Sequence, residues 1–146
     1  MEIEVRIDEN CKDPRIIILT CKMTSEIDLI LKKLSDERPT IITGFKDSVV
    51  ELLEPHDIYR IFAASGKVFA ETTRGEYVVH MRIYELEQRL DMSCFVRISN
   101  SDIINIKKVR NFDLSFTGTI CVTLSNGTVT YVSRRFVSKI KQLLRM

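Results

Sequence analysis

Hydrophobic and polar residues alternate along much of this chain, and the alternation has two different periods. Glu2–Ile7 alternates with a period of two, and residues 15–21 form a β-branched run, so both segments are predicted to be strands. Residues 24–35 instead space their apolar side chains along one helical face, after Thr24 or Ser25 as the N-cap. The first 40 residues are therefore predicted to form a small β-β-α extension.

The remainder, residues 41–146, is predicted to be mainly β with few helices. Pro39 disfavours helix at the residue before it, so the boundary with the extension is expected near residues 36–40. The apolar spacing of residues 82–91 predicts a helix that packs on the strands. Short β segments are expected at 41–43, 48–53, 58–63, 68–72 and 76–80.

The clearest hairpin signal is the Asn126-Gly127 pair. This dipeptide is preferred in two-residue type I′ turns, and such a turn fixes the register of the strands that flank it. It would pair Leu124 with Val129 and Val122 with Tyr131 on one face of the hairpin.

The last segment, SRRFVSKIKQLLRM, contains a local conflict. Ser133 is a good N-cap for an amphipathic helix, which places Arg134 and Arg135 in the first turn. Cations there oppose the helix dipole by about 0.3–1 kcal/mol each, whereas a bound phosphate would make them favourable. Arginine can alternatively bind a guanine edge with two hydrogen bonds. The alternative to both contacts is that the two arginines are exposed to solvent and bind nothing.

The net charge of +2 conceals a strong asymmetry along the chain. Residues 1–93 carry 13 Lys/Arg and 18 Asp/Glu, whereas residues 94–146 carry 9 Lys/Arg and only two acids, Asp102 and Asp113. The C-terminal part is therefore expected to face a polyanion.

Composition and motifs also indicate where the protein is located and whether it is an enzyme or binds a metal. The acidic, alternating N-terminus is unlike a signal peptide, and the uncharged run 114–133 is too polar for a membrane span, so a cytoplasmic protein is expected. The four cysteines form no C-x-x-C pair, which favours buried thiols over a metal site. The chain carries no glycine-rich phosphate loop, G-x-S-x-G or H-E-x-x-H motif, so neither an enzyme nor a cofactor is expected.

Two longer motifs carry a family resemblance. F-V-R-I-S-N-S-x-I-I-N-I-x-x-V begins at Phe95, and V-T-L-S-N-G-x-V-x-Y-V-S-R-R-F-V-x-x-I-K begins at Val122. Together with the upstream E-P-x-D-I-Y and L-E-x-x-L motifs, they resemble the LytTR DNA-binding domain family over residues 41–146. The resemblance implies a β-sheet domain of a bacterial transcription regulator, whose loops enter successive major grooves of double-stranded DNA at direct repeats in promoters.

The resemblance also implies which residues contact DNA. Asn100 and Arg135 match base-reading positions, and Lys67 falls near a third base-reading loop that is shorter here and lacks the family's histidine. Ser99 stands where many members have histidine. Asparagine can pair with adenine and arginine with guanine, whereas lysine and serine mainly bind phosphate. The residues expected at the DNA backbone are Arg97, Ser99, Ser101, Tyr131, Ser133, Arg134 and Lys139.

The extension raises the question of partners. Forty residues cannot supply the receiver domain that many family members carry, so the extension is expected to pack on the body, to mediate a homodimer or to bind a regulatory partner. The resemblance adds a co-encoded membrane protein as a candidate inhibitor. The alternative function is a basic interaction module that binds an acidic protein or a membrane surface.

Overall fold

The computed structural model describes residues 1–35 and 41–146. The chain divides into two compact units, residues 1–38 and 39–146. The boundary predicted near residues 36–40 lies outside the described residues. In the part of the chain that the structure describes, no helix is long and apolar enough to cross a membrane.

The predicted β-β-α extension is right for its helix and wrong for its two strands. Helix α1 (Ser25–Ser35) begins after Thr24, whose hydroxyl accepts a hydrogen bond from the Ile27 amide at 3.3 Å. Within residues 1–24, all of which the structure describes, no strand ladder forms. The alternation of Glu2–Ile7 favours a strand, but a strand is stable only when a partner takes up its backbone hydrogen bonds and covers its apolar face.

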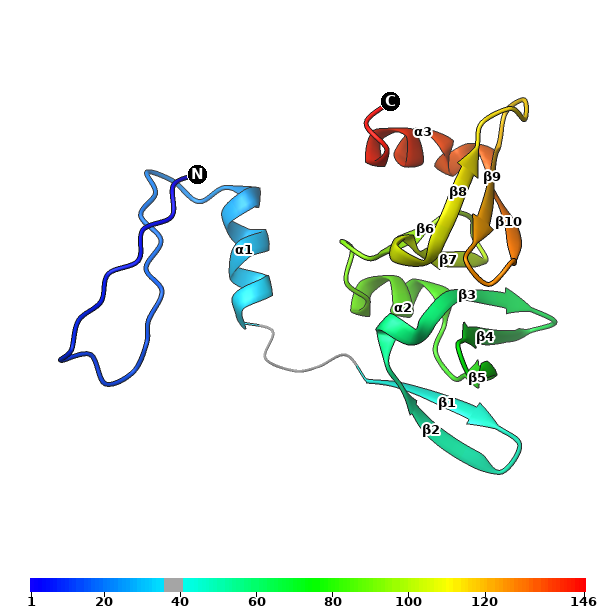
Figure 1. Cartoon of the computed structure of the whole chain (residues 1–146), viewed down its shortest axis with the longest axis horizontal. Helices are drawn as coiled ribbons and strands as arrows, with labels where there is room; N and C mark the ends of the chain where they lie inside the picture. The colour runs from blue at the N-terminus through cyan, green and yellow to red at the C-terminus, as the bar shows by residue number, and fades with distance from the viewer. Residues whose placement is uncertain (36–40) are drawn as a thin grey trace. The chain divides into compact units, whose positions relative to one another are not determined.

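The second unit is built on a seven-stranded antiparallel sheet, shown in Figure 1. The strand order is β2-β1-β5-β4-β3-β7-β6, and all neighbouring strands run antiparallel. The five predicted β segments are confirmed as the first five strands. The strands are β1 (Ile42–Lys46), β2 (Val49–Leu53), β3 (Ile58–Ala64), β4 (Lys67–Thr72), β5 (Gly75–Val79), β6 (Phe95–Arg97) and β7 (Asp102–Asn105).

Helix α2 (Ile83–Arg89) forms the first hydrophobic core with one face of this sheet. Its side chains Ile83 and Leu86 are buried, as is Leu90 just after it, which confirms the predicted packing helix. The core residues are Ile42, Leu53, Ile58, Ile61, Ala70, Tyr77, Val79, Ile83, Leu86, Leu90, Phe95 and Ile103.

A three-stranded sheet and the last helix form a second core with the opposite face of β6 and β7. Ile103 and Ile104 are consecutive in β7, so Ile103 enters the first core and Ile104 the second. The added elements are β8 (Val109–Asp113), β9 (Ile120–Leu124), β10 (Val129–Val132) and α3 (Arg134–Leu143), which lie together at the C-terminal end of the chain in Figure 1. The second core contains Val96, Ile98, Ile104, Ile120, Val122, Leu124, Val132 and Ile140.

The register predicted for the β9–β10 hairpin is wrong by one residue. Thr130 pairs with Val122, and Tyr131 pairs with Cys121. The loop has three residues, because the Leu124 amide donates to the Thr128 carbonyl at 2.8 Å. A turn followed by a glycine in the left-handed region, here Gly127 with φ +92°, is the usual three-residue loop. The shift turns Thr130 inward and leaves Tyr131 exposed.

Candidate nucleic-acid interface

The segment Ser99–Ser101 forms a tight loop between β6 and β7. The Ile98 amide donates to the Asp102 carbonyl at 3.0 Å and closes the loop. The Ser101 carbonyl accepts from the Ala63 amide at 2.8 Å, which fastens the loop to the end of β3. Asn100 lies exposed at its tip. The three polar residues between β6 and β7 therefore form a hydrogen-bonded turn at one end of the large sheet.

Arg97 holds the shape of this loop. Its Nε donates to the Ser99 carbonyl at 3.0 Å, and its Nη2 donates to the Asn100 carbonyl at 2.8 Å. Its Nη1 lies 3.8 Å from Glu87 Oε1, and only 20% of the side chain is exposed. The rigid fork of a guanidinium suits two neighbouring carbonyls. Arg97 was predicted to contact the DNA backbone, but its donors are directed at the loop itself.

The two serines of the loop bind each other. Their hydroxyl oxygens lie 3.3 Å apart, and the Ser101 amide donates to Ser99 Oγ at 3.2 Å. Such a local side-chain bond stabilises a turn. Ser99 is half-buried and acts inside the loop, whereas Ser101 is exposed.

The start of α3 lies beside this loop. The Ser133 amide donates to the Ile98 carbonyl at 2.9 Å, and Ser133 Oγ lies 3.5 Å from the same oxygen. The predicted N-cap position is confirmed, but its hydroxyl points back to β6 instead of capping α3. This anchor fixes where the exposed Arg134 and Arg135 emerge.

Two predicted base-reading residues meet at this point. Arg135 Nη1 lies 3.4 Å from Asn100 Oδ1, although the residues are 35 positions apart, and both side chains are exposed. Arg134 extends the other way, because its Nε would lie 3.4 Å from a Cβ added at Gly118. The loop and the helix start therefore present amide and guanidinium groups together.

Lys67 lies at a neighbouring turn at the same end of the sheet. Ser65 and Gly66 both have positive φ, at 52° and 75°, as a two-residue type I′ turn requires. This turn joins β3 to β4, and Ala63, whose amide binds the Ser101 carbonyl, lies one residue before the end of β3. The third predicted base-reading position therefore emerges on the same side as Asn100.

Lys67 also lines a hollow of about 480 Å³ with two basic residues that the sequence did not single out, His80 and Arg82. They follow β5, and Val79 pairs with Val68, so the register of β4 and β5 brings them to Lys67. The His80 ring stacks on Phe45 with centroids 3.9 Å apart. Only the strand register could have shown this grouping. We call the residues 65–67, 80–82, 99–101 and 133–135 the loop edge.

The other predicted contacts lie outside the loop edge. Tyr131 is 52% exposed on β10, and its ring meets Phe116 edge-on with centroids 6.0 Å apart. Lys139 is exposed on α3. Both are accessible to a ligand that extends beyond the loop edge.

An ion-pair cluster beneath the loop joins three strands of the large sheet. Arg60 Nε lies 2.8 Å from Glu71 Oε2, and Arg60 Nη1 lies 3.6 Å from Asp102 Oδ2. The three side chains are between 13% and 19% exposed. Since Asp102 directly follows Ser101, this cluster fixes the base of the loop.

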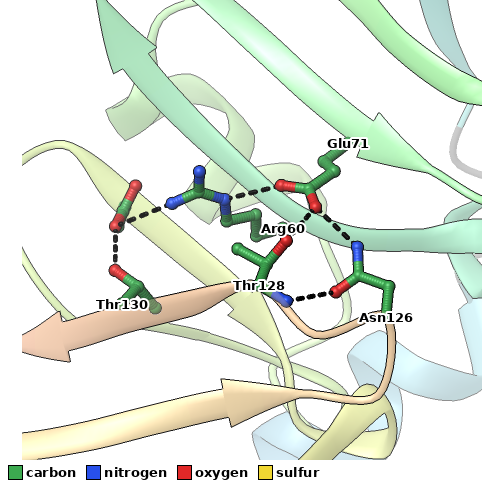
Figure 2. A network of polar contacts seen from close by, with 6 residues as sticks. Arg60, Glu71, Asn126, Thr128 and Thr130 are labelled. Atoms are coloured by element: carbon green, nitrogen blue, oxygen red, sulfur yellow. Dashed lines mark hydrogen bonds and ion pairs between the residues drawn. The ribbon is translucent and has the colours of Figure 1, made fainter.

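The β9–β10 hairpin is bound to the same cluster, as Figure 2 shows. Asn126 Nδ2 donates to Glu71 Oε1 at 2.5 Å, and Thr128 Oγ1 donates to the same oxygen. Thr130 Oγ1 donates to Asp102 Oδ2 at 2.7 Å. These bonds hold the small sheet, and the helix that follows it, in register with the loop.

The network determines the ionisation of Glu71. Burial raises the pKa of its carboxyl, but hydrogen bonds from Thr128, Arg60 and Asn126 and the charge of Arg60 outweigh burial. The net effect is a pKa below the ordinary value of 4.5. Glu71 is therefore a carboxylate at neutral pH.

The basic residues of the C-terminal part do not all lie at the loop edge. Lys107, Lys108 and Arg110 follow the other end of β7. Lys108 Nζ lies 5.4 Å from the centroid of the Tyr59 ring, and Arg110 Nη2 donates to the Ser125 carbonyl at 3.1 Å. The charge asymmetry along the sequence is thus divided between two surfaces.

The cysteines agree only in part with the prediction of buried thiols. Cys121 is buried and Cys94 is half-buried, whereas Cys11 and Cys21 are exposed. Among the described residues, no group of three or more His, Cys, Asp or Glu side chains is placed to hold a metal ion.

Comparison with known proteins identifies the family of this domain. The family model of the LytTr DNA-binding domain matches residues 48–145. This chain belongs to the LytTR DNA-binding domain family. The family is a class of DNA-binding domains rather than of enzymes, and the prediction from the motifs at Phe95 and Val122 is confirmed.

Whole-length relatives of this LytTR protein occur in Staphylococcus aureus. Proteins of strains MRSA252 and NCTC 8325, both named as uncharacterized HTH-type transcriptional regulators, are 28% identical over 145 residues. The match covers 99% of this chain and 98% of each relative, and therefore includes the extension. In this chain α2 and α3 are separated by five strands, so these two helices do not form a helix-turn-helix.

A solved structure confirms the LytTR fold. The LytTr DNA-binding domain of a Bacillus cereus protein, described as a methyl-accepting/DNA response regulator, superposes with a TM-score of 0.70 at 18% identity. The superposition covers 73% of this chain and 98% of that domain. The predicted class, a mainly β LytTR-type domain with few helices, is thereby confirmed.

Proposed function

We propose that this protein is a cytoplasmic transcription regulator that reads promoter DNA with its loop edge. The observation that carries the proposal is the exposed pair of Asn100 and Arg135, brought together from two elements that are each anchored to the Ile98–Asp102 backbone. Preorganised donors and acceptors exposed on a turn suit the major groove, where each base pair presents a distinct pattern of donors and acceptors.

The side chains divide into three roles in this proposal. Asn100 and Arg135 read base edges, with Lys67 at the neighbouring turn as the third reader. Arg97 and Ser99 shape the loop, because their polar groups are bonded within it. Phosphate contacts are assigned to the exposed residues Ser101, Tyr131, Ser133, Arg134 and Lys139.

We further propose that the protein binds direct repeats in promoters, with one domain on each repeat. Three base-reading side chains contact only a few base pairs, so two copies on neighbouring grooves are needed for a long recognition sequence. An inhibitory membrane protein encoded beside the gene remains a prediction from the family resemblance.

Genomic footprinting of the full chain tests this function. Recovered fragments are expected to share a repeated sequence, and a duplex of that sequence is expected to bind at least about 1,000-fold more tightly than its scrambled version at physiological salt. Equal affinity for both duplexes would contradict the proposal. Equal affinity together with binding to anionic vesicles would support the basic interaction module, with Lys107, Lys108 and Arg110 as its surface.

Lys139→Ala is expected to weaken binding to every duplex about equally. The residue is an exposed cation on α3, so its loss removes about one phosphate contact and lowers the slope of log affinity against log salt by about 1. Titrations at several salt concentrations measure the slope. Ser138→Ala, at the exposed neighbouring position, is the control, and a changed base preference in Lys139→Ala would contradict a phosphate role.

Arg82→Ala tests whether the hollow beside Lys67 faces DNA. The variant is expected to lose about 1 kcal/mol of binding free energy on the selected duplex, because Arg82 adds a cation to the same side as Lys67. Arg110→Ala is the matched control, since it removes an exposed arginine of β8, outside the loop edge. Equal losses in the two variants would place Arg82 outside the interface.

A further inference from the structure

The extension exposes an unusual amount of apolar side chain. Ile3, Val5 and Ile7 are 86%, 83% and 94% exposed, and Leu19 is 92% exposed. In the same unit, α1 buries Ile27 and partly buries Ile30. Exposed apolar residues at this density indicate an interaction surface.

The sequence of residues 3–7 is complementary to a second, antiparallel copy of itself. Ile3-Glu4-Val5-Arg6-Ile7 reads symmetrically about Val5, with isoleucine two positions away on each side and opposite charges one position away. Residues two apart lie on one face of an extended chain, and Arg6 Nε accordingly lies 2.7 Å from Glu4 Oε1. One face is therefore entirely apolar, and the other carries one negative and one positive group.

We propose that residues 3–7 form an antiparallel pair with residues 3–7 of a second copy, making the extension a dimerisation element. With Val5 on the two-fold axis, each Glu4 lies opposite Arg6 of the other copy, and Ile3 lies opposite Ile7. A two-fold interface demands this reciprocity, since each residue meets in the partner the residue that meets it. A second copy therefore gives each charged residue an opposite charge and sets the apolar side chains of both copies side by side on one face.

Two further features of the extension support a second copy of the chain as its partner. Residues 15–21, the second segment with strand-type sequence, can add to each edge of the central pair and give four strands, enough for a stable sheet where an isolated ribbon is marginal. Residues 1–35 carry six Lys/Arg and seven Asp/Glu, a net charge of −1, so two copies do not repel each other strongly.

The dimer is independent of the proposed DNA contacts but adds to them. Joining two DNA-binding domains makes the second binding event intramolecular, which raises affinity for paired sites without any new contact. A failure of the dimer would leave the Asn100 and Arg135 assignments untouched, because the assays below contain no DNA.

Charge reversal tests the pairing in the full chain. Sedimentation equilibrium is expected to give twice the chain mass of 16.9 kDa for the wild type. Glu4→Arg places like charges opposite each other twice per dimer and is expected to raise the dimer dissociation constant about tenfold, and Arg6→Glu does the same. The double variant Glu4→Arg/Arg6→Glu restores the opposite pairs and is expected to return to the wild-type constant.

A matched reversal outside the palindrome, Glu9→Arg, is expected to leave the constant unchanged. A wild type that stays monomeric throughout the soluble concentration range would overturn the proposal. A double variant no better than the single variants would overturn the antiparallel register.

Disulfide cross-linking tests where the two-fold axis of the dimer lies. In a Cys11→Ser/Cys21→Ser background, Val5→Cys is expected to form a covalent dimer with a mild oxidant, because directly opposite residues in an antiparallel pair lie within disulfide range. Glu4→Cys, one position away, is expected to cross-link far less. Equal cross-linking at the two positions would exclude an axis at Val5.

Discussion

Replacing Asn100 by alanine is expected to weaken binding to the selected DNA site by about 1–3 kcal/mol and to relax base preference at one position of each repeat. The amide is exposed at the tip of the Ser99–Ser101 loop, where its oxygen and nitrogen can both reach a base edge. The loop itself is expected to keep its shape, because Arg97 binds the carbonyl of residue 100 rather than its side chain. Binding to scrambled duplex is therefore expected to stay near the wild-type value.

The measurement is a set of titrations against duplexes that carry each base at the affected position. Because Arg135 Nη1 lies 3.4 Å from Asn100 Oδ1, the two substitutions are expected to be non-additive in a double-mutant cycle with Arg135→Ala. Asn111→Ala, an exposed asparagine in β8, is the control. An Asn100→Ala protein with unchanged base preference would remove Asn100 from the base-reading set.

Glu71→Ala is expected to lower the free energy of unfolding by about 2–4 kcal/mol. The substitution leaves Arg60 with Asp102 as its remaining ion-pair partner, and it removes the acceptor of Asn126 and Thr128. Urea unfolding measures the loss. Glu76→Ala, at an exposed position that pairs with Glu71 across the strands, is expected to stay within about 0.5 kcal/mol of the wild type. Similar values for both variants would show that the network contributes little.

The same carboxylate makes stability depend on pH in a known direction. The folded protein holds the pKa of Glu71 below the ordinary 4.5, so its contribution is complete above pH 4.5 and is lost as the pH falls through the lower folded-state pKa. Glu71→Gln keeps the shape of the side chain without the charge. The difference in unfolding free energy between wild type and Glu71→Gln is therefore expected to shrink on acidification below pH 4.5. A difference that grows there would contradict the assigned direction.

Periodicity predicted the elements whose apolar faces are covered by other parts of the same domain. The five short β segments and the packing helix α2 were found because their apolar spacing matches the face that they bury. The two strands predicted for the extension do not form. Glu2–Ile7 has the spacing of a strand, but no segment of the described residues pairs with it. A pattern predicts a surface, but it does not supply the element that covers it.

Register was beyond what the sequence could determine. Asn126-Gly127 is compatible with loops of two or three residues, and here Asn126 is bonded to Glu71, which lies 55 positions away. The site shows the same limit. The motifs predicted Asn100 and Arg135, whereas the grouping of His80 and Arg82 with Lys67 depends on how β4 and β5 pair. The inward role of Arg97 likewise depends on two carbonyls that no side-chain pattern encodes.

The bonds from Arg97 to two main-chain carbonyls have a consequence for how such a regulator evolves. Every residue type has a main-chain carbonyl, so the architecture of the loop does not depend on which side chain occupies position 100. With Asn100 as the proposed base reader, a substitution there would alter the preferred operator sequence while the loop keeps its fold. In the proposed function, target choice then rests on the side chain and the fold of the loop on the main chain of the same residue, so operator sequences could diverge between paralogues without loss of stability.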